Sequence, residues 1–293
     1  MTTLFRDPLE DSGVRLSTRG RVFLVGAGPG DPELLTLRAY RLIAGAKVVA
    51  YDELVSQEIL ALAPANAERI AVGRRRGTSP EAPSIHPHVL ERALDGHDVV
   101  RIKGGDPMIF GRGGEEAESL AALGIPFEIV PGVSAALGAA AATGIPLTHR
   151  DAASSVSFVT AHRRHGFGGD DLAERIPRTG TVVLYMGLAT LRDTARRLIA
   201  LGRSPETPVA VVAHATLPSQ REVIADLDTI ADRVDEAELP APALVIVGDV
   251  VAHRVAPSAP SRELARAVVD TDPSAPSALA GLLLEGANEL CEA

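Results

Sequence analysis

The chain has 293 residues, 46% of them hydrophobic, with 29 Lys and Arg against 38 Asp and Glu and therefore a formal net charge of −9. This apolar content excludes disorder along the whole chain, and the single cysteine, Cys291, excludes an internal disulfide scaffold or a thiolate metal cluster. The acidic balance argues against a general nucleic-acid binder, and the length is natural for two domains.

The N-terminal part of the chain predicts a parallel sheet. Residues 1–20 are expected to form a flexible leader, and the first strand is predicted at 21–25, a β-rich run that ends in the glycine turn GAGPGD. A helix is predicted at 33–44, and a buried strand at 48–51 leads directly to Asp52. A strand–turn–helix–strand unit of this kind is typical of a parallel sheet.

The same alternation continues as far as residue 145. Further strands are predicted at 69–72, 99–103 and 127–130, and further helices at 89–94, 116–123 and 134–143. The strand at 99–103 runs into the turn GGDP, and the strand at 127–130 ends at a Pro-Gly pair. Because the periodicity breaks around residues 144–150, we expect an N-terminal α/β domain over 21–145 and a C-terminal α/β domain over 146–255.

The second half of the chain also alternates strands and helices. Strands are predicted at 156–160, 181–186, 209–213 and 243–247, and helices at 191–201 and 226–234. Residues 256–293 are predicted to be a Pro-, Ser- and Ala-rich linker followed by a last helix at 278–290. That helix either docks on the body of the protein or forms a contact between two copies.

No targeting or membrane segment is predicted. The leader mixes both charge signs and contains no apolar core of the kind that signal peptides have. No stretch reaches about 18 uninterrupted apolar residues, the length that a transmembrane helix needs. We therefore expect a cytoplasmic protein that does not bind membranes.

The turn GAGPGD invites a dinucleotide-binding interpretation because it follows a strand and precedes a helix. The dinucleotide fingerprint needs glycine at its first, third and sixth positions. Gly26 and Gly28 satisfy the first two, but the sixth position is Asp31, whose carboxylate would occupy the place of a pyrophosphate. Pro29 also removes a backbone N–H that could bind phosphate. We therefore expect a tight turn in which Asp31 caps the following helix, and no nicotinamide site.

Four strand ends carry candidate ligand-binding turns, because open α/β sheets bind ligands at the carboxyl ends of their strands. These turns are GAGPGD, the segment that begins at Asp52, KGGDP and PGVSA. Asp31, Asp52 and Asp106 make this edge acidic, which favours a cationic or zwitterionic ligand over a polyphosphate. A metal site is not predicted, because His86 and His88 lie two residues apart and no further ligands stand at zinc-site spacing.

Several long motifs occur in an order that is found in one enzyme family. They are VGAGPGDPELLTL, YDELVS, RIKGGDPMIFGRGGEE, VPGVSAALGAAAATGIPLTHRDAASS and LYMGLATL. Through these motifs, from about residue 21 to residue 254, the chain resembles the S-adenosylmethionine-dependent tetrapyrrole methylases, and especially their branch that acts on uroporphyrinogen III. The resemblance implies two α/β domains with the methyl-donor site in the cleft between them, and a homodimer.

The resemblance also implies a reaction. S-adenosyl-L-methionine would donate methyl groups to two pyrrole carbons of uroporphyrinogen III, with S-adenosyl-L-homocysteine as the second product and no metal involved. The tetrapyrrole product would be precorrin-2, the branch point toward sirohaem and cobalamin. Two alternatives stay open: a methylase of a later corrin-ring intermediate, and a non-catalytic protein that binds S-adenosylmethionine.

The family's site residues carry over position by position. By this resemblance the donor contacts are Pro29, Gly104, Gly105, Asp106, Ile109, Ser134, Ala135, Met186 and Ala215. Asp52, in the YD motif, matches the family's proposed proton acceptor. Phe110 and Tyr185 are implied to flank the tetrapyrrole. Arg75 and Arg76 are expected to pair with its carboxylates, since guanidinium groups bind carboxylates in a bidentate manner.

The chain departs from the family pattern in a basic turn. Arg74, in GRRRG, stands where family members carry a lysine that is proposed to donate a proton. A guanidinium, with a pKa above about 12, can supply charge there but is a poor general acid. Ala82 and His86 replace a Gln and an Asn of the family pattern, which weakens the expected contacts at the edge of the substrate. Because the substrate is a polycarboxylate, we expect positive charge around it, with Arg101 and Lys103 among the candidates.

Overall fold

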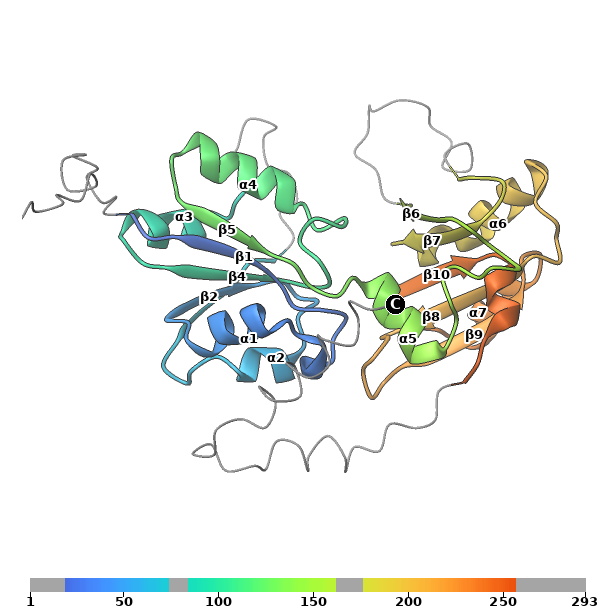
Figure 1. Cartoon of the computed structure of the whole chain (residues 1–293), viewed down its shortest axis with the longest axis horizontal. Coiled ribbons are helices and arrows are strands. Elements are labelled where there is room, and N and C mark those ends of the chain that lie inside the picture. Colours follow the sequence, from blue (N-terminus) through green and yellow to red (C-terminus); the bar gives the residue numbers. More distant parts are fainter. Residues whose placement is uncertain (1–18, 74–83, 162–175, 257–293) are drawn as a thin grey trace, which may run out of the picture. The chain divides into compact units, whose positions relative to one another are not determined.

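A computed structural model describes residues 19–73, 84–161 and 176–256 of the chain. These residues form two five-stranded sheets with helices packed against them (Figure 1). The α/β class predicted from the sequence is confirmed. The leader, except for its last two residues, and nearly all of the predicted linker and tail helix lie outside the described residues.

The first sheet is parallel throughout, with the strand order β3-β2-β4-β1-β5. Its strands are β1 (Val22–Gly26), β2 (Val48–Tyr51), β3 (Glu68–Ala71), β4 (Val99–Lys103) and β5 (Phe127–Val130). Every residue of β4, the central strand, and of its neighbour β1 is buried. Burial on both faces is characteristic of parallel sheets, and it explains why β1, with the sequence VFLVG, has no polar alternation.

Helices cover both faces of this sheet (Figure 1). They are α1 (Leu37–Ala44), α2 (Gln57–Ala61), α3 (Pro87–Leu94) and α4 (Gly113–Ala122). Phe23 and Val25 of β1 pack with side chains of α1 and α2, whereas Val22 and Leu24 pack with side chains of α3 and α4. Successive strand residues point to opposite faces, so a single strand contributes to both cores.

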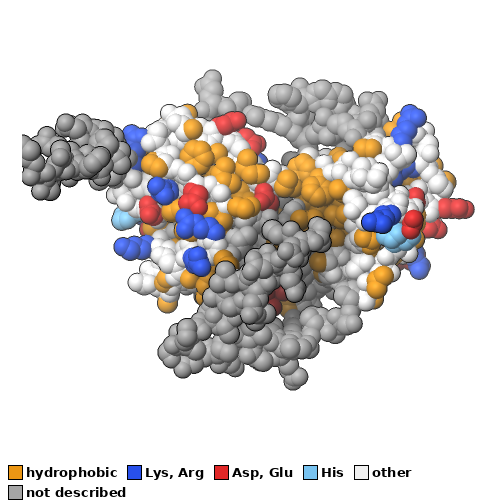
Figure 2. Space-filling view, in the orientation of Figure 1, with side chains coloured by type: hydrophobic (Ala, Val, Ile, Leu, Met, Phe, Trp, Pro, Cys, Tyr) orange, Lys and Arg blue, Asp and Glu red, His pale blue; other side chains and the backbone are white. Residues whose placement is uncertain are grey.

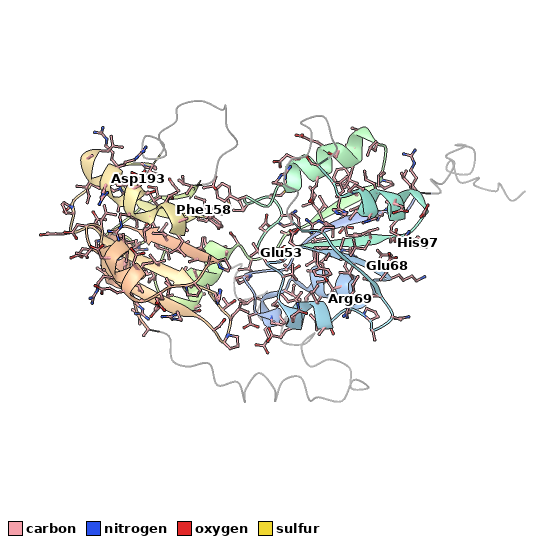
Figure 3. The ribbon with its side chains drawn as sticks, turned by 180° about the vertical axis from the view of Figure 1, so that it is seen from behind. Glu53, Glu68, Arg69, His97, Phe158 and Asp193 are labelled. Atoms are coloured by element: carbon pink, nitrogen blue, oxygen red, sulfur yellow. The ribbon has the colours of Figure 1, made fainter. Side chains whose placement is uncertain are left out.

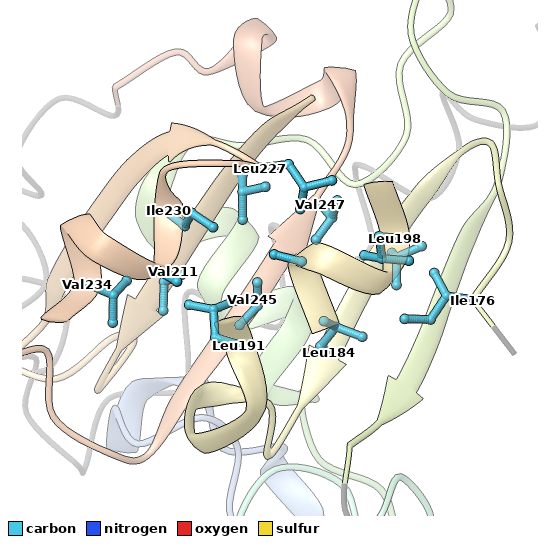
Figure 4. Packing of buried hydrophobic residues seen from close by; sticks show 14 of the residues in the cluster. Ile176, Leu184, Leu191, Leu198, Val211, Leu227, Ile230, Val234, Val245 and Val247 are labelled. Atoms are coloured by element: carbon cyan, nitrogen blue, oxygen red, sulfur yellow. The ribbon is translucent and has the colours of Figure 1, made fainter. Parts of the chain in front are cut away.

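The second sheet is mixed, with the strand order β6-β7-β10-β8-β9. Its strands are β6 (Val156–Thr160), β7 (Thr181–Tyr185), β8 (Pro208–Ala213), β9 (Arg221–Asp226) and β10 (Ala243–Val247). Only the pair β6–β7 is parallel, and the other three pairs are antiparallel. On one face, α6 (Leu191–Ala200) and α7 (Ile230–Glu236) pack over aliphatic strand residues such as Leu184 and Val245 (Figure 4).

The helix α5 (Ala135–Thr143) links the two sheets. It follows β5, the last strand of the first sheet, yet Ala136 and Ala139 are buried among Val183, Ala210 and Ile246 of the second sheet. Its short side chains allow the helix to lie close to those strands. As a result, the beginning of α5 belongs to a turn of the first sheet while its body belongs to the core of the second.

Several elements differ from those predicted, and the helix α2 (Gln57–Ala61) was not predicted at all. The helix predicted at 33–44 is divided into a short 3₁₀ turn, Pro32–Leu34, and α1, because Leu35 is extended and the Thr36 side chain caps a new helix. The strand β9 was not predicted, and the helix expected at 226–234 begins only at Ile230, because Asp226 ends β9 and residues 227–229 form a turn. A strand at the edge of a sheet has a weaker apolar pattern than a central one, since one of its sides is unpaired.

The surface of the described residues mixes both charge signs with apolar side chains. Figure 2 shows hydrophobic side chains gathered near the middle of one face, while Lys, Arg, Asp and Glu are spread over the rest. Exposed large hydrophobic residues include Leu54, Met108, Phe110, Leu137 and Met186. Within the described ranges, no helix combines the length and the apolar character that crossing a membrane requires.

The turns that follow β1, β4 and β5 pack backbone against backbone. A Cβ atom on Gly26 would lie 2.5 Å from the amide nitrogen of Gly132 and 2.7 Å from the carbonyl oxygen of Gly105. A Cβ atom on Gly132 would lie 2.8 Å from the Cα atom of Gly26. All three distances are shorter than a carbon atom can tolerate against fixed backbone, so glycine is required at both positions for this close approach.

We therefore expect Gly132→Ala to lower the free energy of unfolding by about 1–3 kcal/mol, because the added methyl group must push two strand ends apart. The matched control is Gly114→Ala in α4, where an added Cβ meets nothing within 4 Å. Alanine is the better helix residue, so the control should keep stability or raise it by up to about 1 kcal/mol. Urea unfolding measures both, and equal stabilities of the two variants would contradict the packing argument.

Candidate functional site

Two of the candidate ligand-binding turns are joined by backbone hydrogen bonds. The N–H of Gly28 donates to the carbonyl of Gly105 at 3.1 Å, and the N–H of Gly105 donates to the carbonyl of Gly28 at 2.7 Å. Both residues have positive φ, +71° and +67°, which glycine adopts without strain. The turns GAGPGD and KGGDP therefore form one rigid backbone unit.

Asp106 ties this unit to the turn after β5. Its Oδ2 accepts a hydrogen bond from the N–H of Gly132 at 3.0 Å, and its Oδ1 accepts one from the N–H of Met108 at 2.8 Å. The backbone N–H of Ile109 donates to the carbonyl of Asp106 at 3.2 Å. The Asp106 carboxylate thus holds the loop that the sequence assigns to the methyl donor.

The GAGPGD turn also contacts the second half of the chain. The N–H of Asp31 donates to the Thr216 hydroxyl at 3.2 Å, which brings Ala215 and its neighbours to this turn. A Cβ atom on Gly138 of α5 would lie 2.5 Å from Pro29. As expected, Asp31 acts as a cap, because its Oδ1 accepts a hydrogen bond from the N–H of Glu33 at 2.9 Å.

Tyr185, the last residue of β7, connects α5 with the loop after β4. Its hydroxyl lies 2.6 Å from the Ser134 hydroxyl and accepts a hydrogen bond from the N–H of Ala136 at 3.2 Å. Its ring centroid is 4.8 Å from that of Phe110. Burial raises the pKa of Tyr185, so its phenol keeps its proton at neutral pH. Ser134, Phe110 and Tyr185, predicted from distant motifs, therefore meet in the structure.

Strained backbone is concentrated around these residues. Non-glycine residues with positive φ include Phe110, Arg112, Met186, His214 and Thr216, in the turns after β4, β7 and β8. Such conformations are uncommon and persist only where the surroundings impose them, typically at ligand-binding sites. Met186, a predicted donor contact, directly follows Tyr185 and is exposed.

Asp52 is the outermost member of a group of four charged side chains, which we call the Asp52 cluster: Asp52, Arg101, Lys103 and Glu116. Asp52 Oδ1 lies 2.6 Å from Arg101 Nη2, and Asp52 Oδ2 lies 3.8 Å from Lys103 Nζ. Glu116 Oε1 lies 3.2 Å from Arg101 Nη2 and 3.0 Å from Lys103 Nζ. The Asp52 side chain is 31% exposed, whereas those of Arg101, Lys103 and Glu116 are 5%, 3% and 8% exposed.

The cluster corrects one expectation from the sequence. Arg101 and Lys103 were predicted as cations for a polycarboxylate substrate, but both are buried and paired with Asp52 and Glu116. Burial, together with the nearby Arg101 guanidinium, lowers the pKa of Lys103, and Glu116 and Asp52 oppose this change. Residues 101 and 103 share one face of β4, and α4 places Glu116 against that face. Glu116 itself was missed, because a single Glu in a helix carries no local sign of burial.

The turn that carries Asp52 lies beside the glycine turns. The Ser56 hydroxyl donates to the carbonyl of Gly30 at 3.0 Å. A Cβ atom on Gly104 would lie 3.4 Å from the Cβ atom of Leu54, which is ordinary packing. Glu53, labelled in Figure 3, is the neighbour of Asp52 in this turn. Asp52 and the loop that the resemblance predicts to hold the methyl donor therefore share one edge of the first sheet.

The basic turn with Arg74, Arg75 and Arg76 lies outside the described residues. In the described ranges, no group of three or more His, Cys, Asp or Glu side chains is arranged to hold a metal ion. The three carboxylates expected to make this edge acidic all have partners: backbone N–H groups for Asp31 and Asp106, and buried cations for Asp52.

Comparisons with known proteins agree with this arrangement. The family model described as Tetrapyrrole (Corrin/Porphyrin) Methylases matches residues 21–231. A siroheme synthase of Hahella chejuensis is 50% identical over 237 residues, which are 80% of this chain and 50% of that protein. A siroheme synthase of Acinetobacter baylyi is 49% identical over 237 residues, covering 52% of its length. The chain thus spans about half the length of these curated relatives.

Solved structures are similar over nearly their whole length. The uroporphyrin-III C-methyl transferase from Thermus thermophilus, in complex with S-adenyl homocysteine, superposes with a TM-score of 0.68 at 45% identity, covering 80% of this chain and 100% of that one. Cobalt precorrin-4 methyltransferase gives a TM-score of 0.69 at 28% identity, covering 79% and 95%. With the family model matching more than half of its residues, the chain belongs to the tetrapyrrole (corrin/porphyrin) methylase family.

Proposed function

We propose that the chain transfers two methyl groups from S-adenosyl-L-methionine to uroporphyrinogen III, giving precorrin-2. The observation that carries the proposal is the convergence of the GAGPGD, KGGDP, PGVSA and YMG turns through the hydrogen bonds and contacts described above. Further support comes from the Thermus thermophilus structure, a uroporphyrin-III C-methyl transferase that is 45% identical and matched over its entire length. The similarity to the siroheme synthases, which the chain matches over half of their length, supports the same proposal.

The residues of these turns fit the methyl donor. Peptide groups of three glycine turns are drawn together, and exposed Met108, Leu137 and Met186 provide apolar surface. The residues proposed to hold the donor are Pro29, Gly104, Gly105, Asp106, Ile109, Ser134, Ala135, Met186 and Ala215. A neutral-to-cationic nucleoside suits this set better than a polyphosphate, because the described side chains among them include no cation. When bound, S-adenosylmethionine supplies an electrophilic methyl group on a sulfonium.

The chain's own contribution is alignment and proton acceptance. Rigid turns that hold two reactants in line contribute by proximity, and this needs neither a metal nor a covalent nucleophile. Asp52 is proposed to accept the proton that the methylated tetrapyrrole releases, since it is an accessible carboxylate at the same sheet edge. Phe110 and Tyr185 are proposed to flank the tetrapyrrole with their rings, and Arg74, Arg75 and Arg76 to pair with its carboxylates.

The chain is further proposed to act as a homodimer in the cytoplasm. Both proposals rest on the family resemblance of the sequence motifs. Light scattering of the purified chain distinguishes one copy from two.

The function is tested by an anaerobic assay with purified chain, S-adenosylmethionine and uroporphyrinogen III. Mass spectrometry of the oxidised tetrapyrrole should show a gain of two methyl groups. Calorimetry with S-adenosylhomocysteine runs in parallel as the measure of donor binding. Donor binding without any methyl gain would overturn this substrate assignment and lead to assays with later corrin intermediates, or to the non-catalytic alternative.

We expect Asp52→Asn to lower turnover by about 100-fold or more, the usual contribution of a general base, while S-adenosylhomocysteine binding is unchanged. The matched control is Asp31→Asn at the same edge, where asparagine caps the helix as well as aspartate does. That control should keep turnover near the wild-type value. Wild-type turnover in Asp52→Asn would remove Asp52 from the mechanism.

A second pair of variants tests the basic turn. Arg74→Lys should keep turnover, because the positive charge remains. Arg74→Ala should raise KM for uroporphyrinogen III about tenfold or more, as expected for loss of a charged hydrogen-bonded pair. Steady-state kinetics measure both, and an unchanged kcat/KM in Arg74→Ala shows that this residue has no role at the site.

A further inference from the structure

Three buried charged side chains form the inner part of the Asp52 cluster, and the mechanism proposed above uses none of them. Arg101 and Lys103 come from β4, and Glu116 comes from α4. Glu116 Oε1 contacts both cations, at 3.2 and 3.0 Å, so it bridges Arg101 and Lys103. The Asp52 cluster is formally neutral, with two cations and two anions, and Asp52 is its exposed end.

Stability alone does not account for this cluster. Charges removed from water lose hydration, and a buried ion pair is often no more stable than apolar side chains of the same volume. Among the residues that the structure describes, Arg101 Nε and Glu116 Oε2 have no hydrogen-bond partner, so the cluster is not fully compensated. Charged side chains whose burial costs free energy, and which contact an accessible carboxylate, are characteristic of functional sites.

The geometry gives each oxygen of Asp52 its own cation. Arg101 Nη2 faces Oδ1 at 2.6 Å, and Lys103 Nζ faces Oδ2 at 3.8 Å. The guanidinium is fixed in turn, because Arg101 Nη1 donates to the carbonyl of Ile102 at 2.9 Å. The two buried cations therefore fix the orientation of the Asp52 carboxylate, while its exposed part remains accessible to a substrate.

We propose that Arg101, Lys103 and Glu116 are positioning residues that hold Asp52 as an oriented, ionised carboxylate and return it to that state after each methyl transfer. This inference rests on the proposed function. When Asp52 accepts a proton, the cluster changes from neutral to a net charge of +1. The two cations then favour release of that proton from the Asp52 oxygen to water, which restores the acceptor for the second methylation. Glu116 determines the net charge next to Asp52, since its carboxylate offsets one of the two cations.

The balance of charge predicts opposite effects for two variants. Lys103→Met leaves a net charge of −1, so the Asp52 carboxylate takes up a proton more readily and turnover falls off at a higher pH. Glu116→Gln leaves a net charge of +1, so turnover persists to a lower pH. Among the described charged groups, Arg101 and Lys103 from β4 contact Asp52. Glu116 from α4 contacts these two cations, and Glu53 is the residue next to Asp52 in its turn. The shift in Lys103→Met should be about one pH unit, as for loss of an opposite charge within about 4–6 Å of a carboxylate, since Lys103 Nζ lies 3.8 Å from Asp52 Oδ2.

The experiment compares pH profiles of kcat for the full chain and its variants. The double variant Lys103→Met/Glu116→Gln restores neutrality and should return the acid limb to near the wild-type pH. Glu118→Gln, an exposed change of the same charge on α4, is the matched control and should leave the profile unchanged. A merely structural role lowers turnover in both single variants without opposite shifts. Shifts in the same direction, or none, in variants that bind S-adenosylhomocysteine would overturn the proposal.

A spectroscopic readout separates this inference from the proposed function. The Asp52 carboxyl carbon, assigned with Asp52→Asn in the ¹³C-labelled chain, is titrated by NMR without any substrate. The titration midpoint should move to higher pH in Lys103→Met and to lower pH in Glu116→Gln. These movements, seen in a chain that adds no methyl groups, would support the cluster's control of Asp52 while the substrate assignment fails. Active enzyme with an unmoved midpoint in both variants would overturn the inference alone.

Discussion

The close approach of three glycine turns is the constraint on which the rest of the structure depends. Gly26 ends β1, Gly105 follows β4 and Gly132 follows β5, and their backbones leave no room for a Cβ atom at Gly26 or Gly132. Parallel strands place their carboxyl ends at one edge of the sheet. The glycine contact therefore collects the GAGPGD, KGGDP and PGVSA turns at that edge, where Asp106 links the KGGDP turn to the PGVSA turn by accepting a hydrogen bond from the N–H of Gly132.

The helix α5 extends this edge toward the second sheet. Its first turn continues from PGVSA, while Ala136 and Ala139 are buried against strands of the second sheet. This places the Ser134 hydroxyl and the Ala136 N–H on Tyr185. The arrangement depends on small residues, because Gly138 lies directly against Pro29. A helix that was expected from its alanine content alone is thus the connection between the motifs of the two halves.

Charge inside the first sheet follows from strand geometry. Arg101 and Lys103 alternate with apolar residues along β4 and so share the face covered by α4. In the sequence they look like surface cations, and a polycarboxylate substrate makes that interpretation attractive. The structure buries them because Glu116 lies on the covering helix and Asp52 directly follows the neighbouring strand β2. Positive charge for a substrate must therefore come from other residues, such as the basic turn at 74–76.

Local chemistry in the sequence was sufficient to predict the central strands, the Asp31 cap and the glycine turns, because each depends on neighbouring residues. The family resemblance supplied the candidate site residues, motif by motif. Only the tertiary structure decided which side chains surround Asp52. Arg101 is 49 positions from Asp52 and Glu116 is 15 from Arg101, so no local pattern relates them. Their pairing depends on which helix covers which face of the sheet, and packing of the whole domain determines that.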